Sequence, residues 1–317
     1  MSEKGNLISQ VLSVAEKNGL TGITPIELSD AGNLSIHLAP YPIVARIATV
    51  ISEEDADLAY KILVRELRVA RYLQSKGVPV LLPADLTDAG PHDVGGTWMT
   101  FWKYVSPVQL QLPSPSEAVE LVSSLSIAMK GYFDELPALG VWERTCQSAA
   151  RLRKHSDQRV QALLNIFPRV DEQMRLEPSL LIPCHGDANV GNLLPSPEGW
   201  IWTDFEDVSL MPAYWDLASF VCILALFRGI QEPTFRYILD HIDNKTDLKA
   251  FGFAITARTL MSTLGNLDFA LAGHGDLEFA TRELELAEDF IHQIDLIIRG
   301  KDSYINQDFP GCLKGVR

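Results

Sequence analysis

The segment between residues 184 and 216 constrains this chain more strongly than any other stretch of its sequence. His185, Asp187 and Asn192 lie in it with the spacing H-x-D-x-x-x-x-N, and Asp204 follows farther along. Between Asn192 and Asp204, a PSPEG run separates two short apolar stretches, which favours a β-hairpin. Because a hairpin returns the chain to its starting point, Asn192 and Asp204 are expected to lie close together.

These residue types suit the transfer of a γ-phosphoryl group to a hydroxyl. Such a transfer needs a carboxylate beside the attacking oxygen and hard oxygen ligands for the Mg²⁺ that neutralises the phosphates. Asp187 is the candidate for the first role, and Asn192 and Asp204 are the candidate metal ligands. His185 is interpreted as a buried support that hydrogen-bonds the backbone near Asp204. The alternative is a chance spacing in a solvated loop, which average residue usage predicts for about one chain in a hundred.

The same region contains four short motifs, which are HGD at 185–187, NLL at 192–194, TDFED at 203–207 and WDLA at 215–218. These motifs resemble those of the aminoglycoside phosphotransferase family. The members of this family are small-molecule kinases with a protein-kinase-like fold, and they include choline-kinase-like enzymes. Gly186 stands where protein kinases usually carry Arg, and Glu206 stands where they carry Gly. A protein kinase is therefore the less favoured alternative.

The resemblance implies ATP-dependent, Mg²⁺-assisted phosphorylation of a hydroxyl on an aminoglycoside or a similar amine-bearing or polar small molecule. It implies that Asp187 is the catalytic base and that Asn192 and Asp204 bind the metal. Asp216 is expected to accept backbone N–H bonds that support the catalytic loop. Choline, homoserine, sugars and macrolides stay open as other acceptors. A kinase-like module that binds nucleotide without catalysis is a further alternative.

The resemblance also implies an α+β, bilobal protein-kinase-like fold. Residues 1–105 are expected to form a nucleotide-binding lobe with a small antiparallel sheet and one key helix. Residues 106–317 are expected to form a larger, mainly helical lobe for catalysis and substrate binding. Apolar residues at helical spacing predict helices at residues 6–17, 52–76, 116–135, 145–167, 168–176, 217–227, 234–242, 245–272 and 276–299.

Residues 43–48 alternate in the manner of a strand and carry Arg46. In the family this strand carries a Lys that holds the phosphates, and Arg keeps the charge and can bind phosphate oxygens as a fork. Glu66 lies in the second predicted helix and matches the family residue that pairs with this cation. An Arg46–Glu66 ion pair is therefore expected, and the alternative for Glu66 is a solvated helix face.

Two further segments are candidates for contact with the nucleotide. Asn33 and Ser35 lie where a kinase places its phosphate-covering turn, although a plain hairpin turn explains this stretch equally well. Residues 95–105 form an aromatic strand that leads, by its order along the chain, into the hinge between the lobes. Adenine is expected against the backbone near Trp102 and Tyr104. An aromatic run in a strand is also typical of core packing.

Acidic residues outnumber basic ones, and the excess is concentrated in the second half of the chain. The net charge is −14 overall, with nine Lys and Arg against twelve Asp and Glu up to Val105 and eighteen against twenty-nine after it. Nucleic-acid binding is not expected, because a phosphate backbone requires a basic stripe. The acidity suits a cationic or polar acceptor or serves solubility alone. Asp268, Glu283 and Asp289 are possible amine-binding residues, with solvated helix faces as the alternative.

The sequence carries no expected membrane span, since its longest apolar run, at residues 217–227, is too short to cross a bilayer. No apolar leader follows the first residues, so a cytoplasmic location is expected. The four cysteines are scattered without C-x-x-C spacing, which argues against a zinc site or a disulfide framework. Cys184, beside His185, is interpreted as a small apolar residue rather than a catalytic thiol. The oligomeric state stays open.

Overall fold

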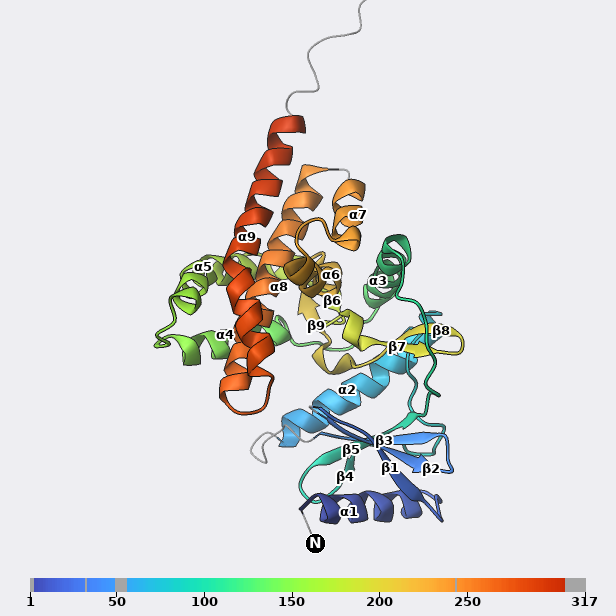
Figure 1. Ribbon diagram of the computed structural model, residues 1–317. Helices are drawn as coiled ribbons and strands as arrows, with labels where there is room; N and C mark the ends of the chain where they lie inside the picture. Colours follow the sequence, from blue (N-terminus) through green and yellow to red (C-terminus); the bar gives the residue numbers. More distant parts are fainter. Residues whose placement is uncertain (1–2, 32, 49–55, 243, 306–317) are drawn as a thin grey trace, which may run out of the picture. The chain divides into compact units, whose positions relative to one another are not determined.

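The computed structural model describes residues 3–31, 33–48, 56–242 and 244–305 of the chain (Figure 1). The chain divides into two compact units, which are described separately. The first unit comprises residues 1–112, 131–133 and 190–208, and the second comprises residues 113–130, 134–189 and 209–317. The lobe boundary predicted after Val105 stays a prediction.

The first unit is built on an antiparallel sheet of five strands in the order β1-β2-β3-β5-β4. These strands are β1 (Thr24–Ala31), β2 (Asn33–Ala39), β3 (Ile43–Ala48), β4 (His92–Asp93) and β5 (Trp98–Lys103). The unit also contains α1 (Glu3–Lys17), α2 (Ala56–Ser75), the short helices η3 (Val190–Asn192) and η4 (Phe205–Asp207), and the hairpin of β7 (Leu193–Ser196) and β8 (Gly199–Trp202). The strands expected in this part of the chain are therefore present.

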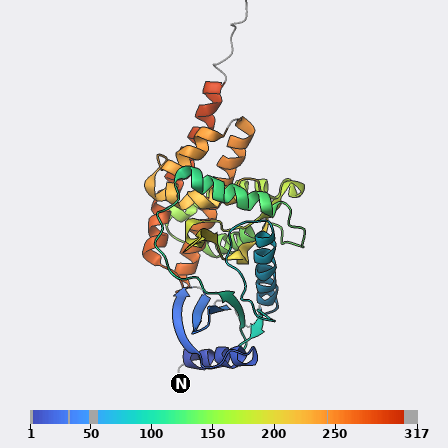
Figure 2. The ribbon, with the colours of Figure 1, turned by 90° about the vertical axis from the view of Figure 1, so that its right-hand side faces the viewer.

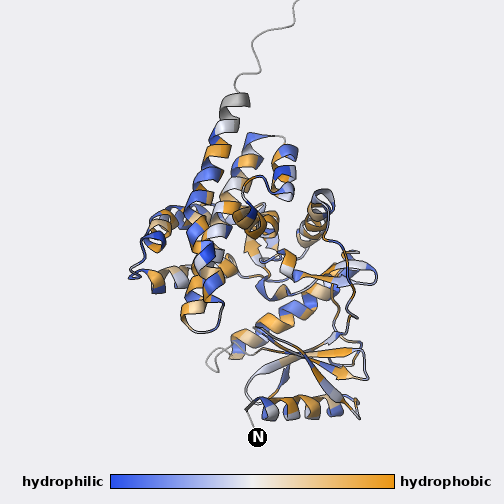
Figure 3. Ribbon diagram, in the orientation of Figure 1, coloured by the Kyte–Doolittle hydropathy of each residue, from blue (hydrophilic) through white to orange (hydrophobic). Residues whose placement is uncertain are grey.

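Helix α1 covers one face of this sheet. Side chains alternate along β2, so Leu34, Ile36 and Leu38 are buried in a core with Val11 and Ala15 of α1. Figures 1 and 2 both show α1 lying along the sheet, and Figure 3 shows hydrophobic and hydrophilic residues alternating along it. Because α1 occupies one face, the polar residues of β2 and β3 that alternate with this core lie on the other.

The second unit is mainly helical. Its helices are α3 (Pro115–Met129), α4 (Gly140–Leu152), α5 (Gln158–Arg175), η2 (Pro178–Leu180), α6 (Trp215–Arg228), α7 (Pro233–His241), α8 (Lys245–Leu271) and α9 (Leu277–Ile305), and β6 (Ile182–Cys184) pairs with β9 (Ser209–Met211). Helix α6 is apolar on most of its circumference, which is typical of a helix in the centre of a core. In the part of the chain that the structure describes, no helix is both long and apolar enough to cross a membrane.

The helix boundaries predicted between residues 145 and 176 are wrong. Helix α4 ends at Leu152, and a new helix begins after Asp157, whose carboxylate accepts a hydrogen bond from the Arg159 N–H. Pro168 does not separate two helices but lies within α5. It lies on an exposed part of the helix, where water can bind the backbone carbonyl that a proline leaves without a donor. An N-cap carboxylate therefore determines the boundary, and the proline does not.

Two other predicted helices also end differently in the structure. Helix α3 stops at Met129, several residues before the predicted end at residue 135. Helix α2 is described from Ala56, so the predicted start at residues 52–55 lies outside the described residues. The predicted helices that became α1, α6, α7, α8 and α9 are confirmed in their position along the chain.

Replacing Leu264 by alanine is expected to lower the free energy of unfolding by about 2–5 kcal/mol, because this fully buried side chain leaves a cavity in the helical core. The matched control is Leu296→Ala in α9, where the leucine is 53% exposed. The control is expected to change the free energy by less than about 0.5 kcal/mol. Urea unfolding measures both, and equal losses would contradict the assigned core.

Candidate active site

Arg46 and Glu66 form the predicted ion pair in the first unit. Arg46 lies in β3 between Ser35 of β2 and Thr100 of β5. Its Nη1 lies 2.6 Å from Oε1 of Glu66, which is fully buried on α2. The alternative of a solvated helix face for Glu66 is wrong, because the helix turns this residue toward Arg46 of the sheet. The ion pair is confirmed, whereas the binding of phosphate by Arg46 stays a prediction.

The same guanidinium also binds two carboxylates of the TDFED motif. Nη2 of Arg46 lies 2.8 Å from Oδ1 of Asp204 and 2.9 Å from Oε1 of Glu206. The Nδ2 of Asn33 donates to the same Oε1 of Glu206 at 2.9 Å. One arginine therefore joins α2 to the segment after β8, which the single ammonium of a lysine could not do with the same fork geometry.

Carboxyl groups outnumber the one guanidinium in this cluster. Burial raises the pKa of the Glu66 and Glu206 carboxyls above the usual range, and the Arg46 guanidinium opposes this rise. Burial alone would lower the pKa of Arg46, but Glu66, Asp204 and Glu206 together raise it. Three carboxyl groups share one guanidinium, and a further cation could replace the protons that the raised pKa values of Glu66 and Glu206 favour.

The donor atoms of this cluster fit a hard divalent cation. Ligand oxygens of Glu66, Asp204 and Glu206 all lie within 4.8 Å of one another. The Oε2 of Glu66 is buried and has no hydrogen-bond partner among the described residues. Carboxylate oxygens are the ligands that Mg²⁺ prefers. Glu206 was not predicted as a site residue. Its position directly after Asp204-Phe205 in the TDFED motif could have indicated that it lies at the site.

The predicted hairpin is confirmed, and it places the two candidate metal ligands of the loop at its open end. Leu193 pairs with Trp202, and the Thr203 N–H donates to the Asn192 carbonyl at 3.0 Å. Asp204 follows directly, in a left-handed backbone conformation with φ of 65°. Few residues other than glycine adopt this conformation, and aspartate is among the more tolerant. The Phe205 N–H donates to Glu66 Oε1 at 3.3 Å, which fixes the segment after Asp204.

In the second unit, Asp216 holds the backbone of the HGD motif. Its two carboxylate oxygens accept the N–H groups of His185 and Gly186 at 3.0 and 3.1 Å. Trp215 donates its indole N–H to the Gly186 carbonyl at 2.8 Å. Gly186 has φ of 89°, a conformation that glycine adopts without strain. The predicted support of the loop by Asp216 is confirmed.

His185 is fully buried, as expected. Its Nδ1 accepts the Asp187 N–H at 3.4 Å, so the ring helps to orient the residue that is predicted to be the base. The expected hydrogen bond to the backbone near Asp204 stays a prediction. Burial raises the pKa of Asp216, and the backbone N–H groups of His185 and Gly186 that donate to its carboxylate oppose this rise.

Asp187 pairs with an arginine that sequence analysis did not identify. Its Oδ1 accepts a hydrogen bond from Nη2 of Arg258, and Nε of Arg258 donates to Ser219 Oγ at 3.0 Å. Arg258 is 6% exposed and lies on α8, whereas Ser219 lies on α6. No motif surrounds Arg258, so only its position in a long apolar helix could have drawn attention to it.

The aromatic residues predicted near adenine take part in the fold of the first unit. The indole of Trp102 is buried and donates to Thr100 Oγ1 at 2.8 Å. Tyr104 stacks on His37 with ring centres 3.9 Å apart, and its N–H donates to the Pro42 carbonyl at 2.9 Å. The Tyr104 amide donor is thus engaged within the lobe, and the adenine contact stays a prediction.

The three carboxylates considered for amine binding have different surroundings. Asp268 pairs with Arg151 and accepts from Ser148 at 2.9 Å. Glu283 is fully buried and accepts from Ser262 and Asn266, each at 2.6 Å, so the solvated face expected for it is wrong. Asp289 is exposed, which confirms the expected solvated helix face. Amine binding by any of them stays a prediction.

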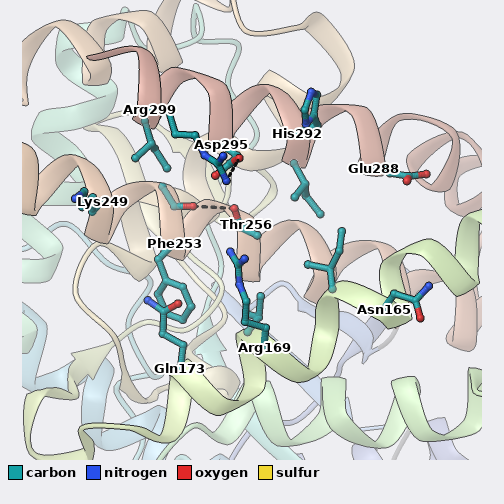
Figure 4. Close-up of a pocket in the computed structure, with 15 residues that line it drawn as sticks. Asn165, Arg169, Gln173, Lys249, Phe253, Thr256, Glu288, His292, Asp295 and Arg299 are labelled. Carbon is teal, nitrogen blue, oxygen red and sulfur yellow. Dashed lines mark hydrogen bonds and ion pairs between the residues drawn. The ribbon is translucent and has the colours of Figure 1, made fainter. Parts of the chain in front are cut away.

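A cavity of about 660 Å³ lies between α5, α8 and α9 (Figure 4). Among the described residues, none of those predicted for the site lines it. Arg169 comes from α5, and the ion pair of Arg299 and Asp295 comes from α9. Thr256 of α8 lines this cavity two positions before Arg258, and such neighbours point to different sides of a helix. The cavity is therefore separate from the contact with Asp187.

The described cysteines fit a packing role. Cys146, Cys184 and Cys222 are free thiols. Burial raises the pKa of Cys184 well above its usual range and that of Cys222 to about 11. A thiol with such a pKa is a poor nucleophile at neutral pH, which agrees with the interpretation of Cys184 as a small apolar residue.

Comparison with known proteins assigns the chain to a family. Residues 52–248 match the model of the phosphotransferase enzyme family, which is more than half of the 317 residues. The chain belongs to this family. The predicted family and phosphotransferase activity are confirmed. The matched residues include Glu66 and the whole segment from His185 to Asp216, but Arg46 and Arg258 of this phosphotransferase lie outside them.

Solved structures confirm the predicted fold class of the phosphotransferase. Choline kinase LicA from Streptococcus pneumoniae is similar with a TM-score of 0.62 and 13% identity, over 90% of this chain and 99% of the other. Amicoumacin kinase hAmiN, in complex with AMP-PNP and Ca²⁺, has a TM-score of 0.61 and 15% identity, over 91% and 96%. Aminoglycoside 2′-phosphotransferase-IIIa, in complex with GDP, has a TM-score of 0.59 and 14% identity, over 91% and 99%. A comparison with curated protein sequences gave no match.

Replacing Asp216 by asparagine is expected to lower the free energy of unfolding of the phosphotransferase by about 2 kcal/mol or more, because a buried carboxylate accepts two N–H bonds. An asparagine would direct an NH₂ group at one of these donors. The control is Asp276→Asn, since the exposed Asp276 also accepts two backbone N–H groups, those of Glu278 and Phe279. Asparagine caps helices as well as aspartate does, so the control is expected to lose less than about 0.5 kcal/mol. Similar losses in both variants would contradict the role of Asp216.

Proposed function

We propose that this phosphotransferase transfers the γ-phosphoryl group of ATP, or of another nucleoside triphosphate, to a hydroxyl of a small polar molecule with the help of Mg²⁺. The main support is the cluster of Arg46, Glu66, Asp204 and Glu206. It combines a buried cation for phosphate oxygens with carboxylates for a metal ion. Family membership supports the reaction class.

The first unit would bind the nucleotide and the metal. Asp204 and Asn192 would hold Mg²⁺, and Glu206 offers a further oxygen. When bound, Mg²⁺ would neutralise phosphate charge and orient the phosphoryl group. Arg46 would keep its contact with Glu66 and turn Nη2 from Asp204 and Glu206 to phosphate oxygens, because a guanidinium binds carboxylate and phosphate with the same fork.

The second unit would supply the base. Asp187 would accept the hydrogen of the acceptor hydroxyl, while His185 Nδ1 accepts the Asp187 N–H and Asp216 holds the two residues before it. Much of the acceleration would come from orientation and charge neutralisation rather than from covalent chemistry.

We propose an amine-bearing or otherwise polar acceptor. The chain after Val105 contains twenty-nine Asp and Glu against eighteen Lys and Arg, which attracts cationic molecules. Aminoglycosides are one such class, and amicoumacin and choline are named as substrates of enzymes with a similar fold. A kinase for another small alcohol is the second candidate, because the buried Arg258 beside Asp187 also suits acceptors without an amine.

Replacing Asp187 by asparagine is expected to lower kcat by about 100-fold or more, because general-base catalysis contributes about 10²–10⁴-fold. ATP consumption with Mg²⁺ is measured against aminoglycosides, choline, homoserine and simple sugars. The control is Asp276→Asn, which is expected to keep the wild-type rate. Turnover by wild type that the Asp187 variant loses supports the proposed function. Full turnover by the Asp187 variant would contradict the proposed role of Asp187.

Replacing Arg46 by methionine is expected to weaken ATP binding by about 10- to 100-fold, because hydrogen bonds between charged groups contribute about 1.5–3 kcal/mol. Arg46→Lys keeps the charge and is expected to lie between methionine and wild type. The control is Arg71→Met, an exposed arginine of α2. Titration of ATP by calorimetry measures all three, and unchanged affinity in Arg46→Met would mean that Arg46 serves the fold alone.

A further inference from the structure

Arg258 is the charged residue of α8 that contacts the predicted base. Its side chain is 8% exposed, and Nη2 binds Oδ1 of Asp187. Nε donates to Ser219 Oγ at 3.0 Å. The three residues come from the catalytic loop, α6 and α8, all within the second unit. A guanidinium buried in a helical core is costly unless it is paired, so its position here calls for a function.

The surroundings of Arg258 leave Asp187 as its carboxylate partner. Thr259 and Ser262 are neutral neighbours in the buried part of α8. Glu283 of α9 is close enough for Arg258 to lower its pKa, but burial raises that pKa more strongly, and its oxygens accept from Ser262 and Asn266. Among the described residues, the hydrogen bonds of Arg258 go to Asp187 and Ser219.

We propose that Arg258 is a positioning residue that holds the Asp187 carboxylate in the orientation needed to accept the hydrogen of the acceptor hydroxyl. This inference rests on the proposed function. In the reaction, the hydroxyl oxygen forms a bond to the γ-phosphorus, and the bond from phosphorus to the bridging oxygen breaks. The nucleoside diphosphate leaves, and the hydroxyl proton goes to Asp187. Because Arg258 binds Oδ1, it fixes the plane of the carboxylate and the direction of Oδ2.

Ser219 gives Arg258 its own orientation. A hydrogen bond at Nε restricts rotation of the planar guanidinium, so Nη2 stays directed at Asp187. The order of the contacts, from Ser219 to Arg258 to Asp187, predicts an order of effects. Loss of Arg258 removes the positioning of Asp187, whereas loss of Ser219 only loosens it.

The two possible roles of Arg258 have different kinetic signatures. A residue that positions the base lowers kcat when it is removed and leaves the KM for the acceptor nearly unchanged. A residue that binds the acceptor itself raises this KM. A lysine keeps the charge but not the fork, so a positioning role predicts partial recovery of kcat in Arg258→Lys.

The test measures kcat, the KM for the acceptor and the KM for ATP in Arg258→Met, Arg258→Lys and Ser219→Ala. Arg258→Met is expected to lower kcat by about 10- to 100-fold, which is the typical cost of a misplaced catalytic group. Arg258→Lys is expected to recover part of this loss, and Ser219→Ala to lose about threefold. The KM values are expected to stay within about twofold. The control is Arg228→Met, an exposed arginine of α6 that is expected to keep wild-type kinetics.

Each other outcome overturns the inference in a recognisable way. Wild-type kcat in Arg258→Met, or a loss confined to the KM for the acceptor, would show that Arg258 does not position the base. If Arg258→Met fails to fold, Ser219→Ala decides, and unchanged kcat in that variant counts against the inference. Phosphoryl transfer by wild type together with any of these results leaves the proposed function standing. Absence of transfer by wild type to every acceptor would overturn both.

Discussion

The guanidinium of Arg46 joins the functional residues of the first unit to one another. It binds Glu66 through one nitrogen and both Asp204 and Glu206 through the other. This one side chain therefore connects the strand, the helix and the segment after the hairpin. Because three carboxyl groups share one guanidinium, the same arrangement suits a metal ion, which could then bind phosphate oxygens. The structural and the proposed chemical role of Arg46 thus follow from one property, the two-sided fork of an arginine.

The second unit organises its loop by a different means, a buried carboxylate bound to backbone. Asp216 accepts the N–H groups of His185 and Gly186, and the positive φ of Gly186 lets the chain turn toward Asp187. Arg258 then contacts the Asp187 side chain from α8. Backbone and side chain of the predicted base are therefore held by separate elements. A loop held by these contacts suits a reaction in which orientation supplies much of the rate.

Local patterns in the sequence predicted the parts of the molecule that depend on neighbouring residues. The hairpin between Asn192 and Asp204 and the strand of Arg46 follow from spacing and periodicity, whereas the loop support by Asp216 was implied by the family resemblance. Contacts between residues far apart in sequence could be predicted only where the family resemblance identified both partners, as it did for Arg46 and Glu66. Arg258 lies in an apolar helix without a motif, so its contact with Asp187 required the folded chain.

The proposed transfer to a small molecule is tested most directly by following labelled phosphate. The enzyme is incubated with γ-³²P-labelled ATP, Mg²⁺ and a small-molecule extract from cells, and protein and metabolites are then separated. We expect the label on a small molecule, in an amount that depends on Mg²⁺ and on active enzyme. Label found only on protein, or only as inorganic phosphate, would contradict the assignment of this chain as a small-molecule phosphotransferase.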